Sequence, residues 1–121
     1  MSNRWVNEGR RDTWRRQAKE EGYRTRSAWK LRQIQDRYHL IRAGDVILDV
    51  GCYPGGWAQV AVELVGEEGE VIGVDLVPCI PVEGAKLLVG DITDIAIQES
   101  VVKELAQRPL NVVVSDISPD I

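Results

Sequence analysis

Residues 45–57 have the sequence DVILDVGCYPGGW, in which an apolar run leads directly into a glycine-rich turn. The apolar part, residues 46–50, consists mainly of side chains that favour β-strands. Gly51, Gly55 and Gly56 allow a tight turn and leave room for a ligand to approach the main chain. The stretch therefore predicts a first strand that is followed by a ligand-binding loop.

A second apolar run follows the glycine loop and ends in a carboxylate. Residues 71–74 have the sequence VIGV and are followed by Asp75, about two dozen residues after the first glycine of the loop. At this distance a nucleotide-binding α/β unit places a carboxylate that binds ribose hydroxyls. The two features together predict a nucleoside-containing cofactor at the end of the first strand.

The size and composition of the chain place it among small single-domain proteins. It has 121 residues, of which 44% are hydrophobic, enough for one modest core. Cys52 and Cys79 lack the C-x-x-C spacing of metal and redox sites, so we interpret them as reduced thiols and expect no metal. No apolar segment approaches the roughly 18 residues of a membrane span. We expect a cytoplasmic protein without a membrane partner.

Positive charge is concentrated in the first third of the chain. Residues 1–42 contain twelve Lys or Arg and five acidic residues, whereas residues 43–121 contain three and fourteen. The basic part also contains large aromatic residues, among them Trp5, Trp14, Tyr23 and Trp29. This combination predicts phosphate contacts and stacking on exposed bases, as in RNA-binding proteins. The alternative is a solvated basic helix that uses its aromatic residues only to dock on the domain.

Periodicity and turn residues predict an alternation of strands and helices. Residues 10–21 are compatible with a helix or a disordered arm. We expect helices over 27–39, 58–64 and 100–107, and strands over 46–50, 70–75, 86–89 and 110–114. Strands that alternate with helices indicate an α/β fold with a parallel, doubly wound sheet.

The residues at the strand ends indicate which nucleoside is bound. Four strands end in residues 49–51, Asp75, Asp91 and Asp116, which should meet in one crevice at the carboxyl edge of the sheet. The loop departs from G-x-G-x-x-G, and Pro54 lacks an N–H that a pyrophosphate would use. Several carboxylates would repel a pyrophosphate but suit the cationic S-adenosylmethionine. An NAD-dependent oxidoreductase remains an alternative, supported by the β-α-β pattern and Asp75.

Five segments, in this order and spacing, resemble the FtsJ/RrmJ family of ribose 2′-O-methyltransferases. They are SAWKL at 27–31, DVGCYPGGW at 49–57, GVDL at 73–76, GDITD at 90–94 and SDISP at 115–119. The resemblance implies a Rossmann-like, S-adenosylmethionine-dependent methyltransferase fold. It also implies methylation of RNA, with a uridine ribose of large-subunit ribosomal RNA as the expected target.

The resemblance also implies roles for individual residues. Asp75 would bind the ribose hydroxyls of the cofactor, Asp91 its adenine end, and Asp116 would lie near the methyl group. Lys30 and Asp116 match two catalytic residues of the family, and we expect Lys30 to orient the ribose because the carboxylate favours its charged form. The family commonly has two alanines at the positions of Cys52 and Tyr53. The full set of expected cofactor-binding residues is Gly51, Gly55, Trp57, Asp75, Asp91 and Asp116.

The family pattern also includes a second catalytic Lys and a Glu that have no counterpart before Ile121. We therefore expect a basic arm over 1–24 and the first part of a methyltransferase domain over 25–121, with an incomplete fold. A catalytically deficient half that binds cofactor or RNA is the alternative function. The fourth strand would have an unpaired edge and an uncovered face, which favours self-association.

Overall fold

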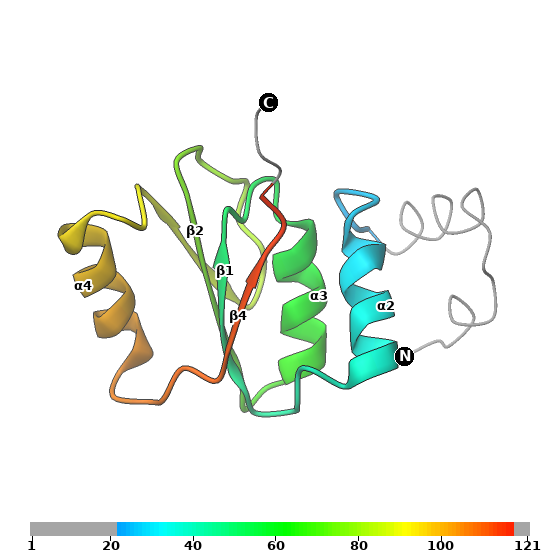
Figure 1. The fold of residues 1–121 in the computed structure, drawn as a ribbon. Helices are drawn as coiled ribbons and strands as arrows, with labels where there is room; N and C mark the ends of the chain where they lie inside the picture. The colour runs from blue at the N-terminus through cyan, green and yellow to red at the C-terminus, as the bar shows by residue number, and fades with distance from the viewer. Residues whose placement is uncertain (1–21, 118–121) are drawn as a thin grey trace.

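The computed structural model describes residues 22–117, which form a four-stranded parallel sheet with helices on both faces (Figure 1). The expected arm over 1–24, with Trp5 and Trp14, therefore lies almost entirely outside the described residues. The sheet order is β3-β2-β1-β4. The elements are α2 (Ala28–Tyr38), β1 (Val46–Val50), α3 (Gly56–Val65), β2 (Glu70–Asp75), β3 (Ala85–Val89), α4 (Ile95–Leu105) and β4 (Val112–Ser115).

Parallel pairing brings the carboxyl ends of all four strands to one edge of the sheet. The register places Val50 of β1 beside Val74 of β2 on one side and Ser115 of β4 on the other. Asp75, the last residue of β2, lies beside Val89, the last residue of β3. The residues that follow these strands are therefore neighbours in space although they are far apart in sequence.

Two apolar layers cover the faces of the sheet unequally. Helix α3 packs on one face and α2 packs outside α3, so that Ile47 and Val71 lie in a continuous core with Val60 (Figure 1). On the opposite face, α4 contributes Val101 to a smaller core with Ile72. Among residues 22–117, no helix is long and apolar enough to cross a membrane.

Helix α2 docks through the aromatic residues that we expected to stack on RNA bases. Trp29 is 2% exposed and Tyr23 is also buried, and their rings meet edge to face with centroids 5.4 Å apart. The buried Arg32 forms an ion pair with Glu63 of α3 and donates to the Tyr23 hydroxyl at 3.0 Å. The stacking role predicted for Tyr23 and Trp29 is therefore wrong, because the apolar face of α2 has to be buried against α3.

The predicted boundaries hold to within one residue except at α3, at α4 and at β4, which begins at Val112, two residues after the expected start. Helix α3 begins at Gly56, two residues before the expected start, because Gly55 with φ 113° provides the turn that precedes it. Helix α4 begins at Ile95 and not at Ser100. The backbone N–H groups of Ile97 and Gln98 both donate to the Asp94 carbonyl, and the Ile97 side chain packs in the smaller core. Residues 95–99 thus form a first helical turn that their apolar alternation obscures.

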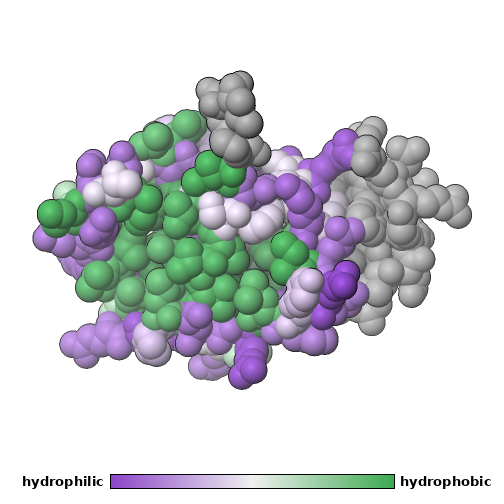
Figure 2. Space-filling view, viewed as in Figure 1, coloured by the Kyte–Doolittle hydropathy of each residue, from purple (hydrophilic) through white to green (hydrophobic). Residues whose placement is uncertain are grey.

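Strand β4 forms the edge of the described sheet, as expected from the sequence. It pairs with β1 on one side, and Val113, which lies beside the buried Leu48, is 58% exposed. In Figure 2 a hydrophobic surface extends over this part of the molecule, next to α4. The sheet face above β1 and β4 is therefore only partly covered by the described residues.

We predict that Trp29→Ala lowers the free energy of unfolding by about 3–5 kcal/mol, because it leaves a large cavity between α2 and α3. Tyr38→Ala is the matched control on the same helix, since Tyr38 is 66% exposed, and should change it by no more than about 0.5 kcal/mol. Urea denaturation measures both. Equal effects of the two substitutions would show that Trp29 is not part of the core.

Candidate active site

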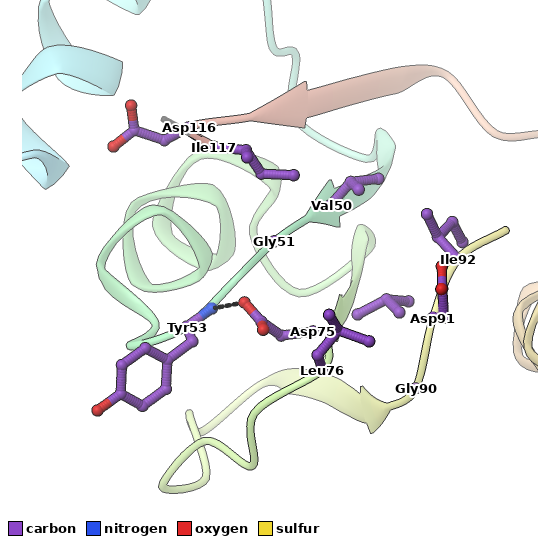
Figure 3. A pocket seen from close by; sticks show the side chains of 11 residues that line it. Val50, Gly51, Tyr53, Asp75, Leu76, Gly90, Asp91, Ile92, Asp116 and Ile117 are labelled. Atoms are coloured by element: carbon purple, nitrogen blue, oxygen red, sulfur yellow. Dashed lines mark hydrogen bonds between the residues drawn. The ribbon is translucent and has the colours of Figure 1, made fainter. Parts of the chain in front are cut away.

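A cavity of about 480 Å³ lies along the carboxyl ends of the four strands (Figure 3). Its walls include four of the residues expected to bind the cofactor, Gly51, Asp75, Asp91 and Asp116, together with the apolar Leu76 and Ile92. Gly55 and Trp57, the other two, do not line it. Within residues 22–117, no group of three or more His, Cys, Asp or Glu side chains is arranged to hold a metal ion.

Asp75 fastens the glycine loop to the end of β2. Its Oδ2 accepts the backbone N–H of Tyr53 at 2.8 Å, and its Oδ1 accepts that of Val77 at 3.0 Å (Figure 3). An ionised carboxylate has about four lone-pair sites, so both oxygens retain acceptor capacity toward a ligand hydroxyl. The ring of Tyr53 is 54% exposed and points away from Asp75. The residue that departs from the family pattern thus contributes its backbone to this contact.

Asp91 follows β3 on the far side of the cavity. Its Oδ1 accepts the backbone N–H of Thr93 at 2.9 Å and the Thr93 hydroxyl at 2.7 Å, and these bonds lower the pKa of Asp91. The side chain is thereby fixed as an ionised acceptor next to Ile92. An acceptor beside an apolar side chain suits a base with an exocyclic amine.

Position 51 requires glycine because of both its backbone conformation and its close neighbours. Its φ is 75°, and a Cβ at this position would lie 2.3 Å from Cγ1 of Ile117. The Ile117 side chain therefore crosses the loop at the point where β1 ends, as Figure 3 shows. Sequence reasoning missed Ile117, because an isoleucine after a strand carries no signal of its own.

Lys30 forms an ion pair with Asp116, which lines the cavity. Lys30 Nζ lies 3.0 Å from Asp116 Oδ1, although the residues are 86 positions apart in sequence. The lysine side chain is 60% exposed, so the pair contributes little to stability. It places an ammonium group and a carboxylate where a substrate can reach both.

Gly55, which does not line the cavity, lies against Arg24. The Arg24 guanidinium donates from Nη1 to the carbonyls of Pro54 (2.9 Å) and Ile80, and from Nη2 to that of Pro81. A Cβ on Gly55 would lie 2.8 Å from Arg24 Nη1. Arg24 therefore joins the glycine loop to the loop after β2, and Gly55 makes room for it. The sequence indicated only that Arg24 was one of several basic residues.

Trp57 lines a second, smaller space of about 30 Å³. Its Nε1 donates to the Ser27 carbonyl at 2.7 Å, which positions the residue before α2. This space, which we call the niche, shares Gly51, Tyr53 and Asp116 with the larger cavity. It therefore adjoins the cavity on the side of α2 and α3.

Asp49 lines the niche and is a buried carboxyl group with a strongly raised pKa. It is 1% exposed, and burial, with smaller contributions from Asp116 and Asp75, raises its pKa from 3.8 to about 7. No donor in residues 22–117 reaches its Oδ2. The sequence indicated Asp49 as a strand-end residue but not that it would be buried beside two other carboxylates.

A model of the FtsJ-like methyltransferase family matches residues 23–121. The chain belongs to this family. The match includes every described element from α2 to β4 and both cavities. It confirms the family resemblance that the five sequence segments indicated.

Individual relatives agree with the family assignment. The chain is 44% identical over its whole length to the ribosomal RNA large subunit methyltransferase E of Methanothermobacter thermautotrophicus, covering 58% of that protein. It is 42% identical to the protein of the same name from Alkalilimnicola ehrlichii, covering 57%. A crystal structure of a Plasmodium falciparum ribosomal RNA methyltransferase superposes with a TM-score of 0.74 at 26% identity, covering 82% of this chain and 58% of the other. The chain thus spans somewhat more than half the length of these relatives.

We predict that Asp49→Asn stabilises the protein increasingly as the pH rises. Since the folded state holds a proton on Asp49 that the unfolded state loses near pH 3.8, the contribution of Asp49 to stability falls from about pH 4 to about pH 7. Relative to the unsubstituted chain, the variant should therefore gain about 3 kcal/mol of unfolding free energy between pH 5 and pH 8.

Urea denaturation at a series of pH values measures this difference. Asp36→Asn is the matched control for the loss of a carboxyl group, because Asp36 is exposed on α2. A difference between Asp49→Asn and the unsubstituted chain that stays constant from pH 5 to pH 8 would contradict the prediction.

Proposed function

We propose that this chain carries the cofactor-binding part of an S-adenosylmethionine-dependent RNA methyltransferase that acts on a ribose 2′-hydroxyl. We propose large-subunit ribosomal RNA as the target, because the relatives are named ribosomal RNA large subunit methyltransferases. The uridine expected from the sequence remains part of the proposal. The observation that carries it is the ion pair of Lys30 with Asp116, which lines a cavity together with the strand-end residues Asp75 and Asp91.

The donor groups of the cavity fit S-adenosylmethionine better than a dinucleotide. Asp75 has acceptor capacity for ribose hydroxyls, and Asp91 offers an acceptor for the adenine amine beside Ile92. Asp75 and Asp116 place carboxylates along the cavity where a pyrophosphate would have to lie. We therefore do not favour the alternative of an NAD-dependent oxidoreductase.

S-adenosylmethionine supplies an activated methyl group when it is bound. The role of this chain is to bring the 2′-oxygen of the ribose into line with that methyl group and to exclude other orientations. The Lys30 ammonium can donate a hydrogen bond to the 2′-oxygen, and Asp116 holds the ammonium at 3.0 Å in the required position. Lys30 is thus proposed to orient the nucleophile, with Asp116 next to the reacting atoms.

RNA binding is proposed for the exposed part of the basic segment 1–42. Arg26, Arg37 and Arg42 are exposed and available for phosphate contacts. Arg24 is instead engaged with three loop carbonyls, and Arg32 is buried against Glu63. The described portion of the segment therefore contains arginines with structural contacts and exposed arginines that could bind RNA, which the count of charges did not distinguish.

Isothermal titration of the full chain tests the cofactor. We expect saturable binding of S-adenosylmethionine and S-adenosylhomocysteine but not of NAD. Asp75→Ala should weaken binding about tenfold or more, the effect of one charged hydrogen bond. Asp36→Ala, which removes an exposed carboxylate of α2, should bind normally. Tighter binding of NAD than of the methyl donor would refute the proposal.

The reaction itself is tested with large-subunit RNA and S-adenosylmethionine labelled on the methyl group. We expect label on a 2′-oxygen, and Lys30→Met should lower the rate constant more than the cofactor affinity. Cofactor binding without any transfer to RNA would favour the alternative of a catalytically deficient binding module.

We also propose that the chain self-associates through β4. The edge of this strand is unpaired within the described sheet, and Val113 exposes most of its side chain beside β1. Light scattering after size exclusion should detect dimers at micromolar concentration, and Val113→Lys should shift them toward monomers. Val102→Lys, at an exposed position of α4, should not. A monomer at every concentration would contradict this.

A further inference from the structure

The niche beside the cavity has no role in the cofactor contacts proposed above. It has a volume of about 30 Å³, and about 10–15 Å³ is enough for one water-sized group. Its lining includes two carboxyl side chains, Asp49 and Asp116, and the hydroxyl side chains of Thr25 and Ser27. Because it shares Gly51 and Tyr53 with the cavity, the two spaces adjoin, and the niche is within reach of a small group attached to a ligand in the cavity.

Asp49 gives the niche an acceptor that the described protein does not satisfy. Its side chain is 1% exposed, and no donor in residues 22–117 reaches Oδ2. Burying a carboxyl oxygen without a partner costs free energy, and burying it as an unpaired carboxylate costs much more. The arrangement therefore requires either a proton on Asp49 or a cation beside it.

The charged groups around Asp49 do not supply that cation. Asp75 approaches from β2 and Asp116 from the end of β4, and both repel an ionised Asp49. Cys52, in the glycine loop, is a buried thiol whose pKa is raised, so it is neutral. Lys30, on α2, is already bonded to Asp116. A cation that satisfies Asp49 must therefore come with a ligand.

We propose that Asp49 carries a proton in the ligand-free protein and releases it when the α-ammonium group of the methyl donor enters the niche. The inference rests on the function proposed above. The ammonium group has the size of the niche and the charge that its carboxylates select, and it replaces the proton as the partner of Asp49. Donor binding is thus coupled to the loss of one proton, and Asp49 is a specificity-determining residue for the amino-acid end of the donor.

Titration calorimetry in two buffers with different ionisation enthalpies counts the released protons. With the full chain at pH 6, S-adenosylhomocysteine, which keeps the ammonium group, should release about 0.9 proton, because Asp49 titrates near pH 7. 5′-Methylthioadenosine, which has the adenine and ribose but no amino-acid end, should release none. The association constant of S-adenosylhomocysteine should rise about tenfold per pH unit up to about pH 6.5 and level off above about pH 7.5.

Two variants and one spectroscopic measurement locate the proton. Asp49→Asn should abolish both the proton release and the pH dependence, whereas Asp36→Asn, an exposed carboxylate on α2, should preserve both. In ¹³C spectra, the carboxyl carbon of Asp49, identified by its loss in Asp49→Asn, should titrate near pH 7 alone and below pH 5 with S-adenosylhomocysteine. The measurement on the unsubstituted chain does not depend on the folding of any variant.

Three results would overturn the inference. Binding of S-adenosylhomocysteine without proton release at pH 6 would refute the coupling and leave the proposed function intact. Equal proton release with 5′-methylthioadenosine would refute the assignment to the ammonium group. Failure of both ligands to bind at any pH would refute the proposed function, and the inference with it.

Discussion

Parallel pairing of β1 with a strand on each side is the constraint on which the site depends. Since β1, β2 and β4 run in the same direction, their carboxyl ends meet at one edge, and the residues there come from positions 49 to 116 of the chain. The packing of α2 and α3 on one face then encloses that edge on one side. Without this pairing neither the cavity nor the niche would exist.

The site combines a glycine loop held by hydrogen bonds with carboxyl groups that repel one another when ionised. Arg24 and Asp75 hold the glycine loop from two directions through hydrogen bonds to its backbone. Around this loop, three carboxylates share a small volume, and the most buried of them, Asp49, has the raised pKa. Such clustering disfavours folding of the ligand-free chain at neutral pH but prepares the site for a cation, a common arrangement where binding or catalysis takes place.

The basic segment contains both buried and exposed residues. Arg32 and Trp29 are buried and attach α2 to α3, whereas Arg26 and Arg37 are exposed. A basic and aromatic composition predicts RNA contact for all of them equally, because it does not reveal which face of the helix is covered. Burial in the folded chain distinguishes the core residues from the exposed ones, and it places Trp29 in the core.

The sequence by itself determined the strand order along the chain, the strand ends and the family, because β-forming runs followed by glycine or aspartate are local signals. It also indicated Gly51, Asp75, Asp91 and Asp116, which the structure brings to one cavity. Only the tertiary structure decided that Lys30 pairs with Asp116, that Arg24 holds two loops, and that Asp49 is buried without a donor on Oδ2. These features depend on contacts between distant segments, and burial and pKa are properties of the packed fold that no local pattern encodes.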